Sequence, residues 1–205
     1  NGYIIITPAR NEADFIEHTL KSVLDQTIRP LQWIIVSDAS TDGTDEIVLR
    51  YAANHSWIQY VRRSHSDTWN FASKVHCFNE GLMALQERNY AYIGNLDGDV
   101  SIPRDHFEFL LQMFDEDPSL GLAGTLMIQK NVNVLRDTFF DERDVFGACQ
   151  LFRRECFEAI GGYQAVRGGG VDWLAVRMAR LRGWKTRTFL DRAFYHHSPM
   201  GYGDR

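Results

Sequence analysis

Short apolar runs alternate with amphipathic helical patterns through the first half of the chain, and this alternation restricts the fold more than any other feature. Strands are expected at 3–7, 33–37, 57–61 and 90–96. Between them, apolar residues recur at helical spacing, as in the stripe of Val75, Phe78, Leu82 and Leu85. Such alternation is typical of βαβ units. We therefore predict an α/β fold with a mixed, mostly parallel sheet flanked by helices.

Pro8 is expected to end the first strand, and the second half is expected to add further elements. Strands are predicted at 120–129, 148–153 and 184–190, and helices at 155–160 and from about 171 to 182. The stretch 131–145 is charged and aromatic without a clear period, so a loop is expected there. A chain of 205 residues suits a single domain, 1–205.

Composition and charge exclude several classes of protein. The net charge of -5 and the lack of a long basic run argue against nucleic acid as a partner. The longest apolar stretch, 120–128, is too short to cross a bilayer, and no leader pattern opens the chain. The three cysteines lack metal-ligand spacing and are expected to be reduced thiols in a cytoplasmic setting.

Two carboxylates, Asp97 and Asp99, flank Gly98 directly after the fourth predicted strand. Ligands bind open α/β sheets at the carboxyl ends of the strands. Two hard oxygen ligands there suit a divalent cation that holds a phosphate-bearing substrate. The alternative is an ordinary turn, in which Asp and Gly are also common.

The first two strands are followed by polar loops. In the first, 7–12, a helix N-terminus could attract an anion, or Asn11 could simply cap the helix. In the second, 38–45, the oxygen spacing resembles the start of an EF-hand, but Leu49 replaces the required Glu and calcium storage is rejected. Asp38 could accept a hydrogen bond from a nucleobase, or the loop could only cap the next helix.

Three further sites carry groups with possible chemistry. Lys74 near a helix N-terminus is unfavourable for the macrodipole unless an anion binds there; the alternative is a solvated lysine. Asp172 could be a general base or only an N-cap. His196 and His197 follow the last predicted strand and could add an imidazole to a metal on Asp99, although adjacent strand residues point in opposite directions.

In their order and spacing these segments resemble the family 2 glycosyltransferases, which have the GT-A fold. No P-loop, dinucleotide-binding or hydrolase motif competes with this interpretation. The segments that carry the resemblance are IIITPARNE at 4–12, VSDASTDGT at 36–44, SKVHCFNEG at 73–81, DGD at 97–99, FRR at 152–154, GGY at 161–163, VDWLAVR at 171–177 and GWK at 183–185.

The resemblance implies an inverting transferase that moves a sugar from a nucleoside-diphosphate sugar, with UDP or GDP, to an acceptor hydroxyl of a glycan, polysaccharide or glycolipid precursor. Residues 1–99 would form the nucleotide-binding half and 100–205 the acceptor-binding half. The donor nucleotide would be bound by Pro8, Ala9, Arg10, Asn11, Glu12, Asp38, Lys74 and Asp97.

The resemblance also implies a metal and a base. Asp99 would ligate Mn²⁺ or Mg²⁺, and Asp97 would contact the ribose or the water shell of the metal. His196 or His197 would be a further metal or diphosphate ligand. Asp172 would be the catalytic base. A cytoplasmic location follows, with peripheral association at the cytoplasmic face of a membrane as an option.

Three residues depart from the family pattern. Ser37 replaces the first Asp of an acidic pair, Ser73 replaces a glycine, and Val171 replaces a Glu before the base. Ser37 and Val171 keep open an alternative function, a non-catalytic nucleotide-sugar-binding module. A sugar-1-phosphate nucleotidyltransferase would want a glycine-rich loop after the first strand, and 7–12 contains no glycine.

Overall fold

The computed structural model describes residues 2–63, 72–132, 140–166 and 168–198. Its strands are β1 (Tyr3–Ala9), β2 (Gln32–Ser37), β3 (Ile58–Arg62), β4 (Tyr92–Leu96), β5 (Val100–Ser101), β6 (Leu120–Gln129), β7 (Cys149–Arg153) and β8 (Lys185–His196). Its helices are α1 (Ile16–Leu24), α2 (Thr44–Ala52), α3 (Ala72–Ala84), α4 (His106–Glu116), α6 (Arg154–Ala159) and α7 (Val171–Leu181). Among the described helices, none is long and apolar enough to cross a membrane.

The strands form one sheet in the order β3-β2-β1-β4-β7-β6-β8-β5. β1 runs parallel to β2 and β4, and β2 runs parallel to β3. β7 lies antiparallel between β4 and β6, while β8 runs parallel to β6. The predicted fold class, a mixed and mostly parallel sheet flanked by helices, is therefore confirmed.

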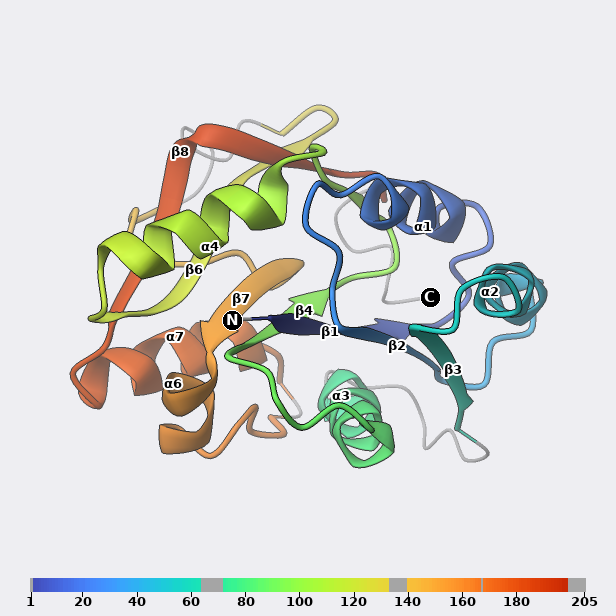
Figure 1. Cartoon of the computed structure of the whole chain (residues 1–205), viewed down its shortest axis with the longest axis horizontal. Helices are drawn as coiled ribbons and strands as arrows, with labels where there is room; N and C mark the ends of the chain where they lie inside the picture. The colour runs from blue at the N-terminus through green and yellow to red at the C-terminus, as the bar shows by residue number, and fades with distance from the viewer. Residues whose placement is uncertain (1, 64–71, 133–139, 167, 199–205) are drawn as a thin grey trace.

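Helices cover both faces of the sheet (Figure 1). Ile5 of β1 packs in a cluster with residues of α1, α2 and α4, whereas Ile4 and Ile6 pack in a second cluster with residues of α3, α6 and α7. All three isoleucines have no exposed surface. The burial of both faces explains why this strand is a continuous apolar run in the sequence.

The prediction that Pro8 ends the first strand is wrong. β1 continues through Pro8 and Ala9, which pair with Val36 and Ser37 of β2. The carbonyl of Ala9 accepts a hydrogen bond from the Asp38 amide, so Ala9 faces β2 and Pro8 faces the other side. Pairing with β4 has already ended there, so the missing N–H of proline leaves no partner unsatisfied.

The predicted end of the last strand, at residue 190, is also wrong, because β8 continues to His196. A shift in the pairing of β8 with β6 lies between Phe189 and Ala193, which pair with Thr125 and Leu126. Asp191 and Arg192 fall in this irregularity, so two charged residues interrupt the sequence pattern while the strand goes on. His196 therefore lies inside β8, where it pairs with Val100 of β5.

Two further expectations concern the predicted loop 131–145 and the three cysteines. Part of the predicted loop 131–145, namely residues 133–139, lies outside the described residues. The three cysteines, Cys77, Cys149 and Cys156, are buried free thiols, as predicted.

Candidate active site

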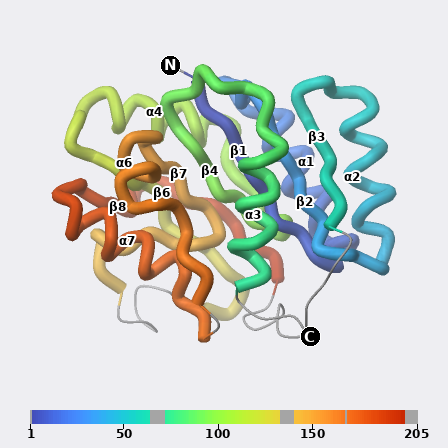
Figure 2. The backbone as a smooth tube through the Cα atoms, turned by 90° about the horizontal axis from the view of Figure 1, so that it is seen from below, coloured from blue at the N-terminus to red at the C-terminus, as the bar shows by residue number. Residues whose placement is uncertain are grey.

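The predicted site residues gather at one edge of the sheet, where β1, β2 and β4 end. Figure 2 shows these strands side by side with their carboxyl ends at the same edge. β7 runs antiparallel to β4, so the segment that leads into β7 reaches the same edge. The amide of Asp97 donates to the carbonyl of Ala148, 2.9 Å away, which extends the β4–β7 contact beyond the strands.

The loops after β1 and β2 interlock through side chains. The amide of Asn11 donates to Ser40 Oγ at 3.1 Å, and Asn11 Oδ1 accepts from the Thr41 amide at 2.9 Å. Asp42 Oδ2 accepts from the amide of Ala13 at 2.9 Å. Asn11 is therefore a link between loops and not the cap of α1, whose first residue is Ile16.

Asp38 is buried at the end of β2 and forms an ion pair. Its Oδ1 lies 2.7 Å from Nη1 of Arg63, and its Oδ2 lies 3.5 Å from Nη1 of Arg10. Arg63 also contacts Glu80 Oε1 at 2.7 Å. Sequence reasoning missed Arg63, although its place directly after the third strand, at the edge where Asp38 lies, was a signal that could have found it.

Ser37, the departure beside Asp38, has a structural role. Its hydroxyl donates to Ser40 Oγ at 3.0 Å, and the side chain is buried. The change from Asp therefore leaves the carboxylate of Asp38 in place.

Lys74 and Asp97 form an ion pair at the centre of this edge. Lys74 Nζ lies 2.7 Å from Asp97 Oδ1, and it also donates to the carbonyl of Gly147 at 3.3 Å. Burial alone would lower the pKa of Lys74, but the charge and hydrogen bond of Asp97, followed by the charges of Asp172 and Asp99, raise it. The lysine is thus held as a cation among three carboxylates.

Asp99 is buried next to a histidine of β8. Nε2 of His196 lies 3.3 Å from Asp99 Oδ2. His197 instead stacks on His18 with ring centroids 4.8 Å apart, and its Nε2 lies 2.8 Å from Ser101 Oγ. Of the two predicted histidines, His196 is therefore the one whose side chain contacts Asp99.

Glu12 adds another carboxylate beside Asp99 and Asp97. Its Oε2 is buried without a hydrogen-bond partner among the described residues. Burial, followed by the charges of Asp99, Asp97 and Asp42, raises the pKa of Glu12 to about 9. Burial and the neighbouring carboxylates thus favour the protonated form of Glu12, and a cation bound at this point would favour its charged form. The carboxylates are suitable ligands for Mn²⁺ or Mg²⁺, and an imidazole ligand favours Mn²⁺ over Mg²⁺.

Asp97 pairs with Lys74 in this structure, with its Oδ1 2.7 Å from Nζ. Within residues 2–63, 72–132, 140–166 and 168–198, no three His, Cys, Asp or Glu side chains are grouped closely enough to hold a metal without adjustment. The metal role predicted for Asp97 stays a prediction.

Asp172 lies in the first turn of α7 and is not its N-cap, which is Gly170. Its carboxylate lies directly against Gly147, and its charge contributes to the raised pKa values of Lys74 and Tyr163. The structure therefore brings Asp172 to the same edge as Lys74 and Asp97.

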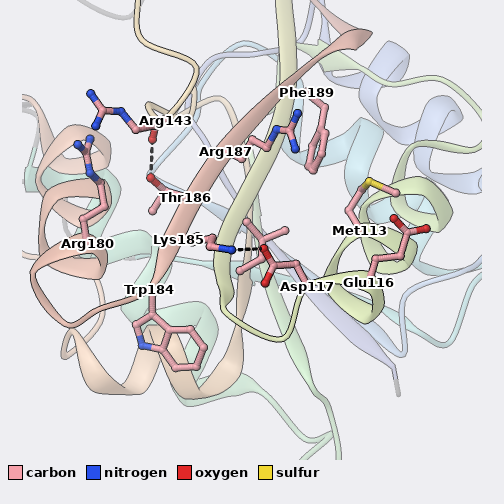
Figure 3. Close-up of a pocket in the computed structure, with 11 residues that line it drawn as sticks. Met113, Glu116, Asp117, Arg143, Arg180, Trp184, Lys185, Thr186, Arg187 and Phe189 are labelled. Atoms are coloured by element: carbon pink, nitrogen blue, oxygen red, sulfur yellow. Dashed lines mark hydrogen bonds and ion pairs between the residues drawn. The ribbon is translucent and has the colours of Figure 1, made fainter.

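A separate cavity of about 470 Å³ lies at the opposite edge of the sheet, where β6 and β8 begin (Figure 3). Lys185 pairs with Asp117 across it at 2.9 Å, and the guanidinium of Arg187 stacks on Phe189. None of the predicted site residues lines this cavity.

The pattern of glycosyl transferase family 2 matches residues 4–138, and the chain belongs to this family. A curated relative is the poly-beta-1,6-N-acetyl-D-glucosamine synthase of Staphylococcus aureus strain MSSA476, which is 28% identical over 135 residues. The match covers 65% of this chain and 31% of the relative, so the chain matches less than a third of that protein's length. The Staphylococcus epidermidis synthase is likewise 28% identical over 135 residues.

Two solved structures share the fold. The mannosyltransferase PcManGT from Pyrobaculum calidifontis, in complex with GDP-Man and Mn²⁺, has a TM-score of 0.76 and 23% identity, covering 97% of this chain and 57% of that one. TarS 1-349 from S. aureus, in complex with UDP-GlcNAc, has a TM-score of 0.78 and 17% identity, covering 99% and 60%. The predicted family and GT-A fold are confirmed. Membership of this family also confirms the predicted enzyme class, a glycosyltransferase.

Proposed function

We propose that this chain is the catalytic domain of a metal-dependent, inverting glycosyltransferase that uses a nucleoside-diphosphate sugar. The observation that carries the proposal is the meeting of Asp97, Lys74 and Asp172 at the carboxyl edge of the sheet in a family 2 chain. A cation and two carboxylates at this edge provide groups for an anionic donor and for the proton of an acceptor.

The donor is proposed to carry UDP or GDP. The structural neighbours were solved with GDP-Man and with UDP-GlcNAc or UDP, so both nucleotides occur on this fold. Asp38, which pairs with Arg63, would accept a hydrogen bond from a base N–H. The linked loops 10–13 and 38–44 form the wall of the nucleoside site, with Pro8 and Ala9 at the end of β1.

Mn²⁺ or Mg²⁺ is proposed as the cofactor. Asp99 and His196 would hold it, and Glu12 would face it with the oxygen that has no other partner. When bound, the metal supplies positive charge that stabilises the diphosphate leaving group. The neighbour solved with Mn²⁺ supports the use of a divalent cation on this fold.

In the proposed reaction, Asp172 accepts the proton of an acceptor hydroxyl as its oxygen attacks the anomeric carbon. The bond from that carbon to the diphosphate oxygen breaks, and the electron pair leaves with the diphosphate. Attack from the face opposite the leaving group inverts the configuration. Lys74, whose pKa is raised, stays protonated and can pair with the anionic phosphates.

The acceptor is proposed to be a growing polysaccharide or another glycan, bound by residues 100–205. The curated relatives are polysaccharide synthases, which supports this class. The predicted location at the cytoplasmic face of a membrane stays a prediction.

A thermal-shift screen of UDP-, GDP- and dTDP-sugars, with and without Mn²⁺, tests the donor class. We expect one nucleotide to raise Tm strongly in a metal-dependent manner. Donor consumption then separates the enzyme from its alternative, a non-catalytic nucleotide-sugar-binding module, which would bind the donor and release no nucleoside diphosphate. Binding of none of these donors would contradict the proposal.

A further inference from the structure

Gly147 contacts both Lys74, on the proposed donor side of the candidate site, and Asp172, the proposed base. It lies two residues before β7. The carbonyl of the next residue, Ala148, accepts a hydrogen bond from the Asp97 amide, which extends the contact between β4 and β7. The carbonyl of Gly147 itself accepts two side-chain donors, Asn95 Nδ2 at 2.7 Å and Lys74 Nζ at 3.3 Å. This carbonyl is thereby fixed from the β4 side and from α3.

Asn95 also holds the carboxylate of Asp97, on the proposed donor side. Its side chain is buried at the end of β4, and Nδ2 also lies 3.1 Å from Asp97 Oδ1. One amide group therefore ties the carboxylate of Asp97 to the carbonyl of Gly147. A buried amide with two such acceptors holds both in a defined relative position.

The missing side chain of Gly147 makes room for Asp172. A Cβ added at Gly147 would lie 2.4 Å from Oδ2 of Asp172, 2.6 Å from its Cγ and 2.7 Å from its Cβ. All three distances are shorter than van der Waals contact, and the last involves an atom that cannot rotate away. Gly147 is not among the residues with positive φ, so space and not backbone conformation is what requires glycine here.

We propose that Gly147 is the positioning residue for Asp172. Asn95 and Lys74 hold the carbonyl of Gly147, which fixes the position of the base relative to Asp97 on the donor side. The inference rests on the proposed function of Asp172 as the base. Any larger residue at 147 displaces the carboxylate of Asp172 while leaving the nucleotide-binding loops untouched. The expected effect is on turnover and not on donor binding.

The first test compares Gly147→Ala with Gly168→Ala in steady-state kinetics. Gly168 precedes the same helix, and no atom of the described residues lies within 4 Å of a Cβ added there, so it is a matched control. We expect Gly147→Ala to lower kcat by about 10²-fold, the effect of misplacing a reacting group by about 1 Å. The donor KM should stay near that of the unsubstituted protein, and Gly168→Ala should behave like that protein.

The second test measures the contact without any turnover. Gly147→Ala and Asp172→Gly are combined in a double-mutant cycle of Tm. We expect Ala at 147 to lower Tm by about 2–4 °C or more when Asp172 is present, and by clearly less in the Asp172→Gly background. If Gly147→Ala fails to fold, restored folding in the double variant gives the same answer.

The outcomes separate the two claims. Equal Tm losses in both backgrounds, or full turnover in Gly147→Ala while Asp172→Asn is inactive, would overturn the positioning role alone. Full turnover in Asp172→Asn would overturn the base assignment and the inference with it. A loss of donor binding in Gly147→Ala that matches its loss of turnover would also count against the inference.

Discussion

Lys74 Nζ lies 2.7 Å from Asp97 Oδ1, and this ion pair joins α3 to the end of β4 at the candidate active site. The lysine side chain keeps 38% of its surface exposed, whereas that of Asp97 keeps 25%. The pair is therefore open to a ligand on one side. An anionic diphosphate that approaches from this side would compete with Asp97 for the ammonium group.

Replacing Lys74 with Ala should weaken binding of UDP or GDP. Charge-assisted hydrogen bonds contribute about 1.5–3 kcal/mol, so we expect a loss of affinity of roughly 10- to 100-fold. Isothermal titration of the nucleoside diphosphate measures it. Lys185→Ala is the control, because Lys185 pairs with Asp117 at the other edge of the sheet; an equal loss in both variants would contradict the role of Lys74.

Metal dependence should reside in Asp99 and His196. In Asp99→Ala, donor affinity should no longer respond to added Mn²⁺, and in His196→Ala the response should be reduced, since Nε2 of His196 lies 3.3 Å from Asp99. His197→Ala is the matched control, because its ring stacks on His18 and contacts Ser101. Binding titrations at several Mn²⁺ concentrations distinguish them. A lost response in His197→Ala with a full response in His196→Ala would contradict this assignment.

Glu12 should make stability depend on pH. Its folded-state pKa, about 9, lies above the ordinary value of 4.5, so the folded state binds more protons than the unfolded state between these values. The free energy of unfolding should therefore fall as pH rises from about 5 to 9. Urea unfolding of Glu12→Gln should show a flatter profile over this range, and Mn²⁺ should stabilise this variant less. The same slope in both proteins would contradict the raised pKa.

The ion pair between Arg63 and Asp38 should contribute to folding as well as to the nucleoside site. Their side chains are 11% and 4% exposed, so Arg63→Ala leaves a buried carboxylate whose other ion-pair partner among the described residues is Arg10, 3.5 Å away. We expect a loss of about 3 kcal/mol in the free energy of unfolding, at the lower end for breaking a buried pair. Arg50→Ala, which removes an exposed pair, should cost less than about 1 kcal/mol. Similar losses would contradict this account.

The parts of the fold that the sequence predicted are those with a strong local signal. The buried strands β1, β2 and β6 are continuous apolar runs, and residues 120–129 were predicted with the bounds that the structure has. The ends of β1 and β8 were missed because pairing with a neighbouring strand extended them past Pro8 and past Asp191. Such pairing is not visible in a single strand's sequence.

The residues of the candidate site likewise include some that the sequence predicted and some that it did not. Asp38, Asp97 and Asp99 follow strands, so their meeting at one edge follows from the parallel sheet. Arg63 pairs with Asp38 and Asn95 bonds to Gly147 through contacts between distant segments, so only the place of Arg63 after the third strand hinted at a role. Gly147 was missed for another reason, because its role is to have no side chain against Asp172.

Turnover of Asp172→Asn is the most direct test of the central claim. The substitution keeps the size of the side chain and removes its basicity. With the best donor, an acceptor and Mn²⁺, we predict a drop in kcat of roughly 10²- to 10⁴-fold, the usual contribution of a general base. Donor affinity should stay close to that of the unsubstituted protein. Unchanged turnover in Asp172→Asn would contradict the account.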